Sequence, residues 1–208
     1  MYSHDLRALF IHVQKTGGST IDRLLLEHLP GAVRVATDDR RHMTLEEALA
    51  EFPDLTDYWT FGFVRNPWAR LHSWHSMILR RGIAADNGQK RALRQLRNNS
   101  FWSGVLKRYP TFEGFVLEGP EEFERLRRPQ LGYLRTDGKR ADFIGRTESF
   151  DHDVAQVLER LGLPVPTQVP RYNAAPAIAT YRDHYSPAMR DRVSEIFAPD
   201  IEEFGYEF

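Results

Sequence analysis

The sequence predicts an α/β fold in which a mainly parallel central sheet is flanked by helices. Short apolar runs rich in strand-forming residues alternate with stretches whose apolar residues recur at helical spacing. Glycine and proline pairs separate the two kinds of segment. The length of 208 residues fits one domain with a sizeable core. We therefore expect residues 1–208 to form a single layered domain.

The first predicted strand, Leu9–Val13, is a short apolar run followed at once by glycines. From Thr20 onward the apolar residues fall at helical spacing, and Pro30-Gly31 ends that pattern. The chain is therefore expected to open with a strand, a tight turn and a helix.

Two helices and a strand are predicted in the next part of the chain. Residues 44–52 indicate a short helix, because Thr44 can cap it and Glu47 follows three residues later. Residues 58–64 are aromatic and β-branched, which favours a second buried strand. Pro67 then suits the first position of another helix.

The C-terminal part repeats the alternation. Residues 141–146 indicate a third strand, and residues 154–161 carry a helical apolar pattern that Gly162 closes. A last helix is predicted to begin at Ser186-Pro187.

The composition narrows the class of protein. Apolar residues make up 41% and charged residues 27%, and the net charge is −1, so the chain is not a polycation built for nucleic acid. The absence of cysteine excludes disulfides, thiolate metal sites and cysteine nucleophiles. The N-terminus lacks the apolar region of a signal peptide, and no apolar run reaches the roughly 18 residues of a membrane span. We expect a cytoplasmic enzyme or binding protein.

Residues 80–108 are strongly basic and are expected to form a helical insertion at about 80–110. Asp86 is the one acid among eight basic residues: Arg80, Arg81, Lys90, Arg91, Arg94, Arg97, Lys107 and Arg108. This pattern fits either a solvated helix face or a wall for an acidic substrate. Neighbouring aromatic residues leave open a third reading, stacking on nucleic-acid bases.

The turn after the first strand has the residues of an anion site. Glycines let backbone approach a ligand, and a helix N-terminus offers N–H groups and partial positive charge. Lysine adds a full charge and hydroxyls add donors. The predicted phosphate-binding loop is Lys15, Thr16, Gly17, Gly18, Ser19 and Thr20. The alternative is a plain strand-to-helix turn.

A second anion pocket is predicted at Arg65, where the second strand meets its helix, with Ser73 about two helical turns further on. The alternative for Arg65 is an ion pair with a nearby carboxylate. Nucleotide triphosphatases commonly end this strand with an aspartate that helps to hold Mg²⁺. Arginine repels a metal, so two anion pockets and no metal site are expected. A Mg·ATP-dependent kinase and a non-catalytic nucleotide or nucleic-acid binding module remain the alternatives.

With these motifs in place, the sequence resembles the sulfotransferases that use 3′-phosphoadenosine 5′-phosphosulfate (PAPS), and most closely the carbohydrate-sulfotransferase branch. The resemblance spans nearly the whole chain. The segments that carry it are the loop at 15–20, Phe63–Ser73, Arg41–Thr44, Pro129-Gln130, Asp142–Glu148, and the C-terminal stretches 181–185 and 204–208. Gln14 departs from the proline common in the family, and residues 80–108 match no element of it.

The resemblance implies a three-layer P-loop-like fold and a metal-independent enzyme. Such an enzyme moves a sulfuryl group from PAPS to an acceptor hydroxyl, here on a carbohydrate or glycan, and leaves 3′-phosphoadenosine 5′-phosphate (PAP). The loop would hold the 5′-phosphosulfate, with Lys15 stabilising the leaving oxygen. Arg65 and Ser73 would hold the 3′-phosphate.

The general base implied by the resemblance is His42, since a neutral imidazole with a pKa near ~6.5 can take a proton. The alternative is a surface or capping histidine. Arg146, at the end of the third strand, would contact the nucleotide or else pair with Glu148. His12 is expected to be structural, and His72 and His75 to be packing residues. Glu46 and Glu47 are further base candidates or a solvated first turn.

Overall fold

The computed structural model describes residues 1–34, 41–170 and 181–208. The chain divides into two compact units, each built from two segments. Unit 1 contains residues 1–65 and 130–174, and unit 2 contains residues 66–129 and 175–208. Each unit is described by itself.

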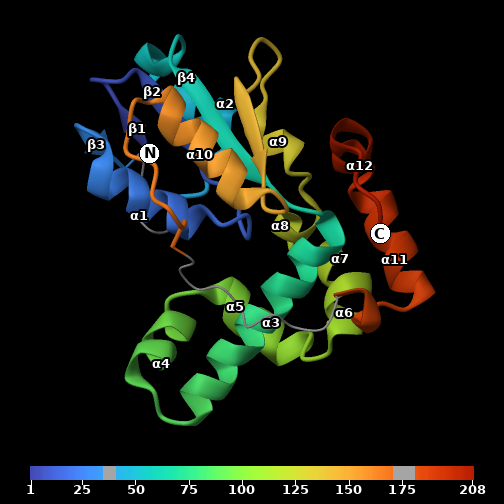
Figure 1. The fold of residues 1–208 in the computed structure, drawn as a ribbon. Coiled ribbons are helices and arrows are strands. Elements are labelled where there is room, and N and C mark those ends of the chain that lie inside the picture. The colour runs from blue at the N-terminus through green and yellow to red at the C-terminus, as the bar shows by residue number, and fades with distance from the viewer. Residues whose placement is uncertain (35–40, 171–180) are drawn as a thin grey trace. The chain divides into compact units, whose positions relative to one another are not determined.

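Unit 1 is built on a five-stranded sheet in the order β3-β1-β2-β4-β5 (Figure 1). The strands are β1 (Tyr2–Ser3), β2 (Ala8–Ile11), β3 (Ala32–Val33), β4 (Trp59–Val64) and β5 (Phe143–Arg146). β2, β4 and β5 pair in parallel, whereas β1 pairs antiparallel with both β2 and β3. The sheet is therefore mixed rather than mainly parallel, because the two-residue strands β1 and β3 extend one edge in the opposite sense. The three-layer P-loop-like arrangement stays a prediction.

Helices flank this sheet. They are α1 (Gly18–His28), α2 (Leu45–Glu51), α9 (Leu131–Leu134) and α10 (Phe150–Arg160), with a 3₁₀ turn η1 (Pro53–Leu55). The apolar sides of α1 and α10 share one buried cluster with Phe10, Phe61 and Phe63 of the strands. Side chains alternate along a strand, so Gly62 faces the opposite side. There Leu134 of α9 fills the space that a Cβ on Gly62 would occupy.

The local signals for helix starts are confirmed. Thr44 and Glu47 form a reciprocal capping box at α2. The Asn66 side chain caps α3 (Pro67–Asp86), and proline occupies an N-terminal position of that helix. Ser186 likewise caps α11 (Pro187–Ile196). Capping satisfies backbone N–H groups that a helix cannot pair internally, which is why these residue types mark the boundaries so well.

Unit 2 is helical in its described residues. Besides α3 and α11 it contains α4 (Lys90–Arg97), α5 (Ser100–Arg108), α6 (Phe112–Leu117), α7 (Gly119–Glu122), α8 (Glu124–Arg127), η2 (Tyr181–His184) and α12 (Ala198–Phe204). The basic segment 80–108 comprises the end of α3 followed by α4 and α5. Within the unit, the fully buried Arg70 lies over the rings of Trp74 and Phe197.

Candidate functional site

The turn from β2 to α1 has the backbone of an anion-binding loop. Gly17 caps α1 with φ 83°, and Lys15 also lies in the left-handed region, with φ 70°. No side chain caps this helix, and its first turn carries no acidic residue. The N-terminus of α1 therefore keeps its partial positive charge with no acidic residue in its own first turn, which suits an anionic ligand.

The two glycines of the loop are required by close packing. A Cβ on Gly18 would lie 2.1 Å from Nε2 of His12, and one on Gly17 would lie 2.4 Å from the Phe150 ring. Both distances are far shorter than any tolerated contact, so the loop backbone rests directly on these two rings. His12 thus forms part of the floor beneath the loop.

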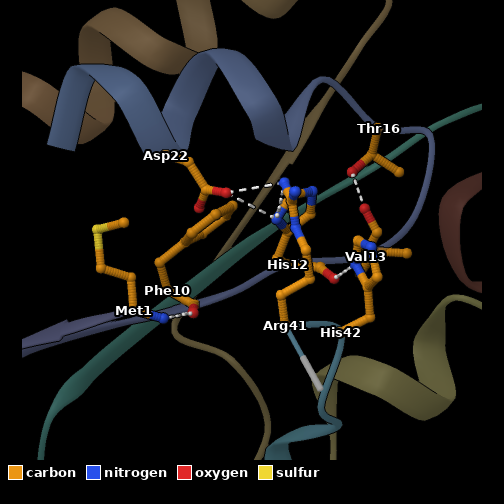
Figure 2. Close-up of polar contacts among 8 residues, drawn as sticks. All are labelled: Met1, Phe10, His12, Val13, Thr16, Asp22, Arg41 and His42. Carbon is orange, nitrogen blue, oxygen red and sulfur yellow. Dashed lines mark hydrogen bonds and ion pairs between the residues drawn. The ribbon is translucent and has the colours of Figure 1, made fainter. Parts of the chain in front are cut away.

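The hydroxyl of Thr16 braces the loop from inside. Its Oγ1 donates to the carbonyl oxygen of Val13 at 2.9 Å, and the residue is almost fully buried (Figure 2). Ser19 is half-buried and Thr20 is buried, both in the first turn of α1. The contribution of these three hydroxyls to ligand binding stays a prediction.

Arg65 follows β4 and lies beside the loop. β2 and β4 are parallel neighbours, so the residues after their carboxyl ends meet at one sheet edge. Nη1 of Arg65 is 3.5 Å from the carbonyl oxygen of Lys15. The two predicted anion-binding side chains, Lys15 and Arg65, therefore belong to one region of unit 1.

The backbone of Arg65 is held by a buried amide. The backbone N–H of Arg65 donates to Oε1 of Gln130 at 2.9 Å, and Nε2 of Gln130 donates to the Arg65 carbonyl at 2.8 Å. Gln130 is fully buried. This pair of bonds imitates one rung of a β-ladder and fixes the point at which the arginine side chain leaves the sheet.

Arg146 ends β5 and is supported in a similar way. Its backbone N–H donates to Oδ2 of Asp153 at 2.6 Å, and the same oxygen accepts from Oγ of Ser149 at 2.7 Å. Asp153 lies on α10 and is buried. Contact between Arg146 and a nucleotide stays a prediction.

A partly buried polar cluster of His12, Asp22 and Arg41 lies next to the loop and joins three parts of unit 1. Oδ2 of Asp22, on α1, is 3.2 Å from Nδ1 of His12 and 3.0 Å from Nη2 of Arg41 (Figure 2). Nη2 of Arg41 is also 3.4 Å from Nδ1 of His12. Nη2 of Arg41 is a donor, so it forms no hydrogen bond with Nδ1 of His12 if that nitrogen carries a proton. The contact from Nδ1 to the Asp22 carboxylate is shorter and favours a protonated Nδ1 that donates to Asp22.

Charge in this cluster is set by burial and pairing. Burial raises the pKa of Asp22, but the hydrogen bond from His12 and the positive charge of Arg41 outweigh it, so the pKa lies below its ordinary value. Burial lowers the pKa of His12, although Asp22 acts in the other direction. The cluster therefore holds an ionised carboxylate beside a neutral imidazole.

His42 lies beside this cluster. Its Nδ1 is 2.9 Å from the main-chain oxygen of His12, and the two imidazole rings are 4.5 Å apart in an edge-to-face contact. A carbonyl can only accept, so Nδ1 of His42 carries the proton and Nε2 keeps its lone pair. Burial is the largest cause, and with the nearby positive charge of Arg41 it lowers the pKa of His42 to about 3. The ring is consequently a neutral imidazole with one unprotonated nitrogen.

Unit 1 contains every predicted site residue except Ser73. Ser73 is half-buried on α3 and belongs to unit 2. His75 is buried and packs against Phe112 and Phe115, and its Nε2 is 3.3 Å from the Tyr109 carbonyl oxygen. Glu47 serves the capping box of α2.

Three supporting residues were not assigned a role from the sequence: Asp22, Gln130 and Asp153. Asp22 left a signal, because it lies on the apolar stripe of α1, four residues after Gly18 and three before Leu25. A charged residue at such a position needs a buried partner. Gln130 binds the backbone of Arg65 and Asp153 binds the backbone of Arg146. Neither pair has a sequence spacing that would predict the contact.

Two further findings concern the part of the chain that the structure describes. It contains no group of three or more His, Cys, Asp or Glu side chains that could hold a metal ion. None of its helices combines the length and apolarity needed to cross a membrane.

Comparison with known proteins adds one match. The family model described as the sulfotransferase family matches residues 1–207, which includes both units and every site residue above. Comparisons with curated proteins and with solved structures gave no match.

Proposed function

The chain belongs to the sulfotransferase family, and from that premise we propose that it transfers a sulfuryl group from PAPS to a hydroxyl of a carbohydrate or glycan. Sulfuryl transfer is the general chemistry of the family. The donor, the acceptor and the roles of individual residues are our proposal.

The observation that carries the proposal is the meeting of two cationic motifs at one edge of the sheet. PAPS has anionic groups at both its 5′ and its 3′ positions. Lys15 and the uncapped N-terminus of α1 suit the 5′-phosphosulfate, and Arg65, fixed by Gln130, suits the 3′-phosphate. Gly17 and Gly18 lack the Cβ atoms that would block close approach of the backbone. Ser73 and Arg146 would supply further contacts to the nucleotide.

In this reaction the acceptor oxygen bonds to sulfur while the bond between sulfur and the 5′-phosphate oxygen breaks, and that oxygen keeps the electron pair. Lys15 and the loop N–H groups stabilise the charge that develops on the departing oxygen. The acceptor hydroxyl loses its proton to Nε2 of His42. Catalysis by the chain is therefore positioning, charge stabilisation and one proton transfer.

The low pKa of His42 is compatible with a general base once the negative charge of the donor is taken into account. Burial and neighbouring positive charge keep the ring neutral, so the base is available without deprotonation. An anionic donor in the loop would favour the protonated ring and raise its pKa toward a value suited to proton transfer. Donor binding would thereby prepare the base.

A saccharide acceptor is proposed from the family resemblance and from the basic surface of unit 2. The Lys90, Arg91, Arg94 and Arg97 side chains of α4 are all exposed. An exposed row of cations suits a substrate that already carries carboxylate or sulfate groups.

Ligand-dependent melting tests the donor. We expect PAP to raise the melting temperature of the wild type by roughly 5–10 °C at a hundredfold excess over Kd. ADP and Mg·ATP should have little effect. Lys15→Ala and Arg65→Ala should lose the response, whereas Arg34→Ala, an exposed basic residue of the same unit, should keep it. Stabilisation by Mg·ATP but not PAP would favour the kinase alternative and end this proposal.

Labelled PAPS tests the transfer itself. Incubation with a panel of neutral and acidic saccharides should move the label to at least one of them, and His42→Ala should reduce the rate by about 10²–10⁴-fold. Near-full turnover by His42→Ala would show that another group is the base. Labelling of non-saccharide hydroxyls alone would contradict the proposed acceptor class.

A further inference from the structure

The segment that carries His42 has no regular secondary structure. Arg41 and His42 lie in a turn that precedes α2, and neither is part of a helix or strand. A general base must be held in a defined orientation to be effective. This turn must therefore be held next to the donor loop by contacts of its side chains.

Polar contacts among the described residues tie this turn to His12. His42 donates to the main-chain oxygen of His12, and Arg41 donates to Asp22, whose same oxygen accepts from the His12 ring (Figure 2). The His12 ring in turn supports Gly18 of the loop. One partly buried cluster thus contacts both the donor loop and the base.

Asp22 is the central member because it is the acceptor for both side chains. Its carboxylate is 18% exposed, and its lowered pKa keeps it ionised, so it cannot donate. Arg41 must donate to it, and so must Nδ1 of His12. Asp22 thereby holds Arg41, the residue before His42, and the ring of His12. The His12 carbonyl accepts from Nδ1 of His42 at 2.9 Å, and this bond leaves Nε2 of His42 unprotonated.

We propose that Asp22, acting through His12 and Arg41, is a positioning residue that holds His42 in the tautomer and orientation a general base requires. The role rests on the proposed function, since it assumes that His42 takes the acceptor proton. Neither Asp22 nor His12 touches a reacting atom in this scheme. In other proteins, residues hydrogen-bonded to a functional histidine fix the orientation of its ring and the position of its proton. Asp22 and His12 would act on His42 in the same way.

A double-mutant cycle on the rate of sulfuryl transfer tests the proposal. Asp22→Asn keeps an oxygen acceptor for His12 and should therefore fold, but it weakens the bond to Arg41. We expect it to lower kcat by roughly 10- to 100-fold with little change in the KM for the donor. In a His42→Ala background the same substitution should cost less than about twofold, because the group it positions is gone.

Two variants serve as controls. Glu27→Gln removes an exposed carboxylate from the same helix and should leave the rate unchanged. Arg41→Gln breaks the same link from the other side, at a residue whose side chain is 35% exposed, and should reproduce the loss in kcat. It keeps the test open should Asp22→Asn fail to fold.

A spectroscopic measurement does not depend on turnover. Nitrogen-15 NMR of histidine-labelled wild type should show His42 as a single neutral tautomer with the proton on Nδ1. Asp22→Asn should show a mixture of the two tautomers or exchange broadening, and Glu27→Gln should match the wild type. A wild-type His42 protonated on Nε2, or an unchanged spectrum in Asp22→Asn, would overturn the proposal.

The outcomes separate this inference from the proposed function. Equal losses from Asp22→Asn with and without His42 would show that Asp22 acts elsewhere, although the enzyme still transfers sulfuryl groups. Loss of the melting response to PAP in Asp22→Asn would assign it to the donor loop instead. A wild type that neither responds to PAP nor transfers label would refute the proposed function, and the NMR result would then decide the tautomer alone.

Discussion

The amide of Gln130 offers a direct test of how the second anion motif is positioned. Gln130→Met keeps the length and the unbranched shape of the side chain but removes both hydrogen bonds to the backbone of Arg65. Gln130 is fully buried, so water cannot readily replace the lost partners. The substitution therefore isolates the effect of the two bonds from the effect of packing.

The expected cost can be worked from the two bonds. Each contributes about 0.5–1.5 kcal/mol net, and leaving the N–H and C=O of Arg65 without their partner adds part of the cost of unpaired polar groups. The sum is about 2–4 kcal/mol. For a chain of 208 residues this corresponds to a fall of about 5–9 °C in Tm.

Calorimetry with and without PAP measures both consequences. The Tm of Gln130→Met should fall by the amount above. The stabilisation by PAP should also shrink, because the backbone of Arg65 is no longer held in place by the amide. Gln156→Met, on the exposed side of α10, is the matched control and should remain close to the wild type. If Gln130→Met melts within about 1 °C of the wild type and responds equally to PAP, the amide does not position Arg65.

Other consequences of the structure can be measured on the free protein. Gly18→Ala places a Cβ against His12 and should destabilise by about 1–3 kcal/mol, whereas Gly132→Ala, with no atom near its Cβ position, should not. The pKa of His42 is lowered to about 3 in the folded protein but is about 6.5 in the unfolded chain, so the unfolded state binds more protons and stability is lost as the pH falls through this window. Between pH 7 and 5 urea unfolding should show a loss of about 2 kcal/mol from this group that is absent in His42→Gln. Thr44→Ala should cost about 1 kcal/mol by removing the cap of α2, and an unchanged urea midpoint would contradict that.

Local chemistry made much of the fold predictable. The helix starts at Thr44, Pro67 and Ser186-Pro187 lie where the sequence predicted them, because the signals act within a few residues of chain. The strands β2, β4 and β5 were also predicted from the sequence. By contrast, β1 and β3 have two residues each, too few for any periodicity to be seen, and their antiparallel pairing made the sheet mixed.

The candidate site was predictable to the extent that its residues are contiguous. The loop after β2 and the arginine after β4 could be found because each forms a motif within one turn of chain. Their supports could not: Gln130 is 65 residues from Arg65, and Asp22 is 19 residues from Arg41. Such pairs are brought together by the tertiary fold, and the spacing of residues in one sequence does not predict them.

The backbone conformation of Lys15 lowers the stability of the folded protein. A residue with a Cβ disfavours the left-handed conformation found there, at a cost of about 1 kcal/mol or more that glycine would not incur. Considered for folding alone, glycine would be the better residue at position 15. On our proposal that Lys15 stabilises the departing oxygen, the lysine is kept for the reaction at a cost to folding. Lys15→Gly should then give a protein that melts at a higher temperature and no longer transfers sulfuryl groups.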